Sequence, residues 1–111
     1  MDNNSSPLQL AKELERQVLT IFSDVDIDTL PGNAKINVAR IKQDLVGARL
    51  DIRDYEFAES ATEQTKSATA AQKRLKDTHA LIVKISEYNI FAAADVAQLG
   101  AQIEQIIERM E

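Results

Sequence analysis

The sequence predicts an all-α protein, on three observations. Its 111 residues include only three glycines and two prolines, too few for the frequent turns of an all-β chain. Hydrophobic residues make up 44% of the chain but aromatic residues only 5%, which is typical of an aliphatic core. Several segments carry apolar residues at alternating spacings of three and four, the period of one helix face. We expect an antiparallel four-helix bundle, or a long helical hairpin with two flanking helices.

The first helix is predicted over residues 6–23, after an N-terminal tail (1–5) expected to be disordered. Ser6 is a suitable N-cap, Pro7 suits the first helical position, and Gln9 completes a capping box. Apolar residues then recur at helical spacing: Leu10, Ala11, Leu14, Val18, Ile21 and Phe22. A loop is expected from Asp24 to Gly32, because it ends in the strong turn signal Pro-Gly.

The second helix is predicted over residues 33–59, with Asn33 as its cap. It carries an unbroken heptad stripe that indicates packing against a partner helix. The residues of this stripe are Val38, Ile41, Leu45, Ala48, Ile52 and Tyr55.

The third helix is predicted over residues 65–88, because a new stripe begins there in a different phase. Its residues are Ala68, Ala71, Leu75, Thr78, Ile82 and Ile85. Either a tight turn or one phase-shifted continuous helix would explain the slip. We expect a break within residues 59–65, since two antiparallel helices bury both stripes. Asn89 suits the left-handed position that ends a helix.

The fourth helix is predicted over residues 92–110, so that residues 6–111 form a single helical domain. Its apolar face consists of Val96, Leu99, Ile103, Ile106 and Met110, widened by Ile107. The spacing again alternates between three and four.

The residue types argue against catalysis and against a resident metal or cofactor. The chain has no cysteine, and hence no thiolate nucleophile or cysteine metal site. Asp24, Asp26 and Asp28 resemble the start of an EF-hand loop, but Thr29 stands where glycine is needed and Lys35 where a bidentate acid is needed. The single histidine, His79, lacks the neighbours of a base or a metal ligand. We therefore expect no enzymatic activity and no cofactor.

No apolar run approaches the roughly 20 residues that span a bilayer, and residues 1–6 lack the basic start of a signal peptide. The net charge of −5 disfavours contact with nucleic acid or anionic lipid. These features predict a cytoplasmic protein without membrane contact.

Charge is distributed unevenly between the last two predicted helices. Lys73, Arg74 and Lys76, here called the basic patch, lie in a basic segment, and the chain from Ile85 to Glu111 is acidic. The two helices would complement one another if they lay side by side. Alternatively, the basic patch would bind nucleic acid or an acidic partner.

Two further groups are candidate contacts. Ala93, Ala97 and Ala101, here called the alanine ridge, would let two helix backbones approach closely, either within the chain or between copies. Tyr55 and Phe57 would serve as core residues or as an exposed anchor for a partner.

The function expected from these patterns is that of a small helical protein–protein interaction module: an adaptor, a chaperone-like protein or a regulatory subunit. Its partner would be itself, as a homodimer or higher oligomer, or another protein. The alternative is a nucleic-acid-associated regulator that uses the basic patch. The third hypothesis is a helical-bundle enzyme or metal carrier.

Overall fold

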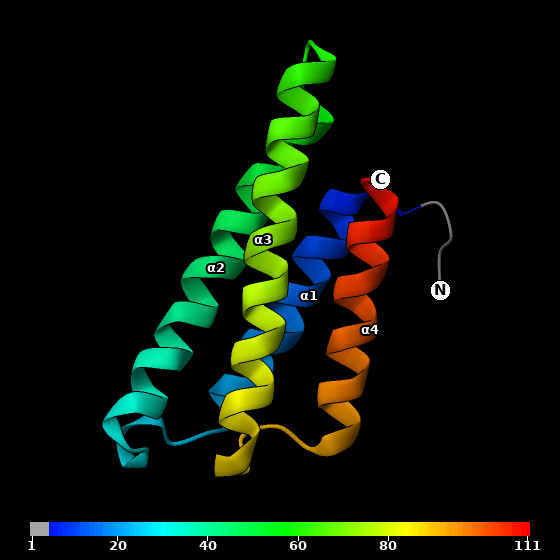
Figure 1. Cartoon of the computed structure of the whole chain (residues 1–111). Helices are drawn as coiled ribbons and strands as arrows, with labels where there is room; N and C mark the ends of the chain where they lie inside the picture. The colour runs from blue at the N-terminus through cyan, green and yellow to red at the C-terminus, as the bar shows by residue number, and fades with distance from the viewer. Residues whose placement is uncertain (1–4) are drawn as a thin grey trace.

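A computed structural model describes residues 5–111 (Figure 1). The predicted tail over residues 1–5 lies, apart from Ser5, outside the described residues. The described residues form α-helices joined by short turns, and no strand. The elements in order are α1 (Pro7–Ser23), η1 (Ile27–Thr29), α2 (Gly32–Glu56), α3 (Ala61–Ile85), η2 (Ser86–Tyr88) and α4 (Ala93–Arg109), where η marks a short 3-10 helix. The predicted all-α class is confirmed.

The two long helices α2 and α3 form an antiparallel hairpin, against which the shorter helices pack. α1 packs against α2, α4 packs against α3, and α1 and α4 also contact each other. The α2–α3 end of the hairpin projects beyond α1 and α4 (Figure 1). The guanidinium of Arg109 donates a hydrogen bond of 2.7 Å to the carbonyl of Ser5, which ties the end of α4 to the start of α1.

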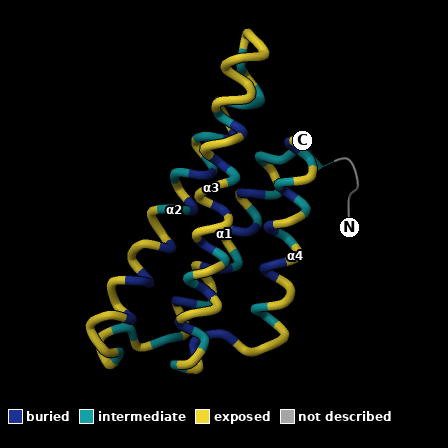
Figure 2. Tube along the Cα trace, viewed as in Figure 1, coloured by how far each residue is buried: buried dark blue, intermediate teal, exposed yellow. Residues whose placement is uncertain are grey.

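The core lies where the helical stripes meet. The α3 stripe from Ala68 to Ile85 is buried at every predicted position, and the α2 stripe is buried from Val38 to Ile52. Figure 2 shows these buried residues along the inner sides of the helices. At the end opposite the projecting hairpin, Phe22 and Phe91 pack edge to face with their ring centroids 5.6 Å apart. Burial of these stripes is the main stabilising contribution.

The break between the second and third helices is confirmed, but it lies earlier than predicted. α2 ends at Glu56 rather than at residue 59, and α3 begins at Ala61 rather than at residue 65. Ser60 caps α3, because its hydroxyl accepts a 3.1 Å hydrogen bond from the backbone N–H of Glu63. The Ser-x-x-Glu spacing of these two residues was the signal for the correct start.

The cap predicted at Asn33 is wrong. Pro31 occupies the N-cap position of α2, and the helix begins at Gly32. The backbone of Pro31 is extended, with φ of −58° and ψ of 154°, and α2 starts without a hydrogen bond from a side-chain cap. Asn33 lies in the first turn, where its side-chain oxygen accepts from the N–H of Ala34.

The remaining boundaries differ from the predictions by a few residues. The capping box of Ser6 and Gln9 is present at the start of α1. α3 ends at Ile85 and is followed directly by η2. Asn89 ends η2 in the predicted left-handed conformation, with φ of 60°. The loop after α1 contains η1, and α4 is one residue shorter at each end than expected.

Candidate interaction surface

A second apolar stripe runs along α2 on the side that faces away from the core. We call it the outer face of α2. Its seven positions alternate in spacing by three and four: Ile36, Ala39, Gln43, Val46, Leu50, Arg53 and Phe57. All seven are exposed, and the exposed fractions of the large apolar residues are 63% for Ile36, 37% for Val46, 38% for Leu50 and 74% for Phe57.

The geometry of the helix explains why one stripe is buried and the other is not. The outer face starts at Ile36, two residues before the buried stripe starts at Val38. Two residues correspond to a rotation of about 200°, so the two stripes lie on nearly opposite sides of α2. α3 and α1 pack on either flank of the buried side. In Figure 1, α2 lies at the edge of the molecule, and Figure 2 shows exposed residues along its outer side.

Leu19 of α1, 40% exposed, extends this apolar surface. The register between α1 and α2 follows from two contacts: Arg49 pairs with Glu15 at 2.8 Å, and the ammonium of Lys42 lies 5.8 Å from the centre of the Phe22 ring. Leu19 lies between Glu15 and Phe22 along α1. Because α1 and α2 are antiparallel, Leu19 is level with Val46, which lies between Lys42 and Arg49 on α2.

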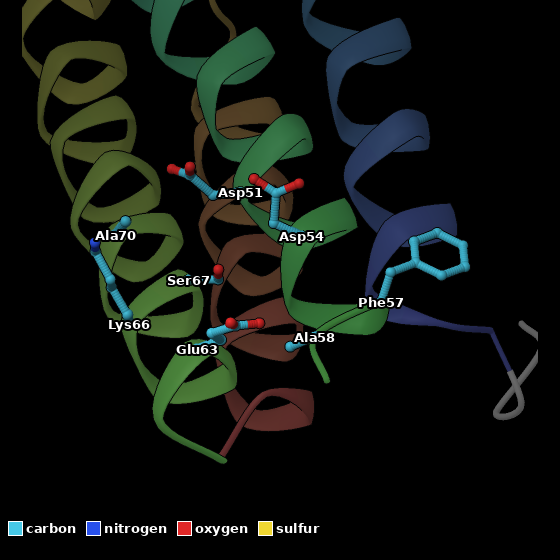
Figure 3. A pocket seen from close by; sticks show the side chains of 8 residues that line it. All are labelled: Asp51, Asp54, Phe57, Ala58, Glu63, Lys66, Ser67 and Ala70. Carbon is cyan, nitrogen blue, oxygen red and sulfur yellow. The ribbon is translucent and has the colours of Figure 1, made fainter. Parts of the chain in front are cut away.

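The projecting end of the hairpin carries a groove of about 460 Å³, here called the tip groove. Its walls combine three carboxylates with one ammonium, and Figure 3 shows them around the α2–α3 turn. The residues that line it are Asp51, Asp54, Phe57, Ala58, Glu63, Lys66, Ser67 and Ala70. In Figure 3 the Phe57 ring is directed away from Lys66 and Ala70. Phe57 therefore belongs both to the rim of this groove and to the outer face of α2.

Tyr55 and Phe57, which the sequence left undecided, have different environments. Tyr55 is half-buried and packs against the core cluster, as the last position of the buried stripe. Phe57 is the C-cap residue of α2 and is three-quarters exposed. Only Phe57 is available as an anchor for a partner.

The structure divides the basic patch among different partners. Arg74 lies 3.0 Å from Asp51 and 3.7 Å from Asp44, both on α2. Lys73 pairs with Asp77, one turn further along α3, at 3.0 Å.

Lys76 is the third cation of the basic patch and lines a surface depression with Glu104 and Glu108 of α4. The expectation that basic α3 lies beside acidic α4 agrees with this arrangement. Lys73 and Arg74 are thus paired with carboxylates of this chain, and Lys76 shares a depression with two more, so the basic patch does not form one free positive surface.

The alanine ridge does not pack inside the chain. Ala93, Ala97 and Ala101 are all exposed, so close packing within the chain, the first of the two expected roles, is wrong, and packing between copies stays a prediction. The close approach between α3 and α4 occurs beside the ridge instead, at Gly100. A Cβ atom there would lie 2.7 Å from the Nε2 atom of His79, so the histidine is a packing residue.

Neither a metal site nor a membrane-spanning helix is present among residues 5–111. No group of three or more histidines, cysteines or carboxylates is arranged to hold a metal ion, and the aspartates from Asp24 to Asp28 are exposed. Within the same described part of the chain, the helices are too short or too polar to cross a bilayer.

The outer face of α2 was not singled out in the sequence, although its spacing is as regular as that of the buried stripe. The two polar positions, Gln43 and Arg53, make its hydrophobic pattern weaker. The signal that identifies it is a second heptad stripe on one helix, since an ordinary surface helix has one apolar side.

Comparison of the chain with protein-family models, with curated proteins and with solved structures found no match.

Proposed function

We propose that this chain is a protein–protein interaction module, of the adaptor or regulatory-subunit kind, that binds a helical partner through the outer face of α2. One observation carries the proposal. Of the six large apolar residues that are exposed in the described chain, four lie on this one stripe of one helix. Scattered exposed apolar residues are ordinary, whereas several aligned on one face of one helix are typical of an interface.

The form of the surface supports a helical partner. Residues at alternating spacings of three and four make the ridge that fits between the side chains of a facing helix. Phe57 at one end and Ile36 at the other are the most exposed, and binding would remove the apolar surface of these side chains from water. Large aromatic and aliphatic residues of this kind are common anchors in interfaces.

Site-specific photo-crosslinking in the cells that make this protein tests the proposal. The photoreactive amino acid p-benzoylphenylalanine replaces Phe57, where the native side chain is already aromatic and exposed. Val83 on α3 is the matched control, because it is 51% exposed and lies outside the outer face of α2. We expect a covalent product from position 57 and none from position 83.

A product that contains either a second copy of the chain or another protein supports the proposed function. Leu50, which is 38% exposed near the middle of the outer face, is the second position for p-benzoylphenylalanine. If neither position 57 nor position 50 yields a product, the outer face of α2 is not an interaction surface and the proposal is wrong.

A further inference from the structure

We infer that the partner of the outer face of α2 is a second copy of this chain, bound antiparallel so that the two α2 helices form the interface of a twofold-symmetric dimer. The inference rests on the proposed function and names its partner. It is carried by the complementarity of the outer face with its own reversed copy, both in side-chain size and in charge.

Size complementarity selects one register of the antiparallel pair. In this register Val46 faces Leu50 of the partner subunit, and the twofold axis repeats the contact as Leu50 against the partner's Val46. The exposed Phe57 faces the small Ala39 of the partner subunit. Large residues thus meet small ones or residues of matching size, as close packing requires.

The polar positions also match in this register. Gln43 faces Arg53 of the partner subunit, so the side-chain carbonyl of one can accept from the guanidinium of the other. Polar layers of this kind reduce stability but specify register and orientation. A shift by one heptad in one direction would place Val46 against Gln43. A shift in the other direction would place Leu50 against Arg53 and leave only four layers within α2, with Val46 against Phe57 as the outermost pair.

Charge supports the same register. The flanks of the outer face are basic in the first half of α2, at Arg40 and Lys42, and acidic in its last turns, at Asp54 and Glu56. Antiparallel packing places Arg40 beside Asp54 of the partner subunit, a contact of opposite charges that occurs twice. Lys42 and Glu56 lie on the α1 side of this face and are engaged within their own chain. The Lys42 ammonium lies 5.8 Å from the centre of the Phe22 ring, and the Glu56 carboxylate accepts a 3.3 Å hydrogen bond from the backbone N–H of Leu8.

Parallel packing fails on the same charges. It would place Arg53 against its own copy at the interface and bring Lys35 next to Arg40 of the partner subunit. Both contacts unite like charges. The antiparallel register also brings Arg49 beside its own copy, but the guanidinium of Arg49 is paired with Glu15 of its own chain at 2.8 Å. In the antiparallel register the paired positions run from Ala39 to Phe57, which is about 27 Å at 1.5 Å of rise per residue, and they form six consecutive layers of contact, with Ile36 beyond the last layer.

Mass and mixing experiments test the dimer and its register. Light scattering should give twice the chain mass of 12.3 kDa, and Leu50→Glu and Phe57→Glu should each return the chain to a monomer that retains its helical circular dichroism. Val83→Glu, the control on α3, should remain a dimer. A wild-type mass of 12.3 kDa up to millimolar concentration overturns the inference.

The absence of native cysteine makes single-cysteine variants specific probes of register. Under mild oxidation, Val46→Cys mixed with Leu50→Cys should form a disulfide-linked dimer, and each alone should form far less. Strong self-linkage of Val46→Cys would show a parallel or shifted pair and overturn the proposed register.

Charge exchange provides an independent readout. Arg40→Asp and Asp54→Arg should each raise the dimer dissociation constant roughly tenfold, and the double variant should restore it, because both symmetric pairs are re-formed with reversed sign. Additive weakening in the double variant contradicts the pairing. A monomeric chain that crosslinks from position 57 to a different protein would overturn this inference and leave the proposed function intact.

Discussion

Replacing Gly100 by alanine is expected to destabilise the protein, even though alanine is the better helix former. In an exposed helix interior this exchange stabilises by about 1 kcal/mol. At Gly100 the added Cβ would lie 2.7 Å from Nε2 of His79 and 3.1 Å from Cε1, whereas ordinary contacts begin at 3.4 Å. The imidazole must retreat by about 0.7 Å, the difference between 2.7 and 3.4 Å.

The magnitude follows from these two opposing effects. Overpacking of a well-filled contact costs about 1–3 kcal/mol. After the gain in helix propensity, Gly100→Ala should lower the free energy of unfolding by up to about 2 kcal/mol. In the His79→Ala background the obstruction is gone, so the same exchange should stabilise by about 1 kcal/mol. The coupling energy between the two positions is then about 1–3 kcal/mol.

Urea unfolding followed by circular dichroism measures all four proteins of this cycle. Gly32→Ala is the matched control, because a Cβ at Gly32 would meet nothing within 4 Å, and its effect should be the same with and without His79. If Gly100→Ala stabilises the wild type as much as it stabilises His79→Ala, α3 and α4 do not approach closely at this point.

Three further predictions concern single side chains. Hydrogen bonds from Arg16 and then Gln17 lower the pKa of the Glu13 carboxyl from about 4.5 to about 2. Because the pKa of Glu13 is lower in the folded state, the wild type should have a higher free energy of unfolding than Glu13→Gln. This difference should reach its full value above pH 5 and disappear toward pH 2. A difference that does not change with pH between 2 and 5 would refute the pairing of Glu13 with Arg16. Thr78→Val should change the free energy of unfolding by less than about 1 kcal/mol, because the buried hydroxyl donates only to the carbonyl four residues earlier, a backbone acceptor that its own helix already uses. Ile52→Ala removes a fully buried side chain and should cost about 2–5 kcal/mol in urea unfolding; a cost below 1 kcal/mol would contradict its place in the core.

Local sequence signals were sufficient for most of the fold. Three kinds of signal depend only on residues close together in the sequence, and each is present in the structure. They are the capping box at Ser6, the left-handed Asn89 and the spacing of the four apolar stripes. The boundary errors have local causes as well. The Ser60–Glu63 cap was overlooked, and Pro31 preceded α2 without a side-chain cap at Asn33.

The interaction surfaces were less predictable, because exposure depends on residues distant in the chain. Arg74 belonged to a basic patch in the sequence, yet its charge is directed to carboxylates on α2. Ala97 was a candidate for close helix packing within the chain or between copies, yet within the chain Gly100 makes the close contact with α3. In both cases the orientation of one helix against another decided the outcome.

α2 shows most directly what each level determines. The sequence by itself determines that this helix has two apolar stripes about 200° apart, because the period of the helix is a local property of the backbone. Only the tertiary structure decides that the stripe starting at Val38 is buried and the one starting at Ile36 is exposed. The reason is that α1 and α3 pack against the flanks of the first stripe, a contact between segments that no local pattern encodes.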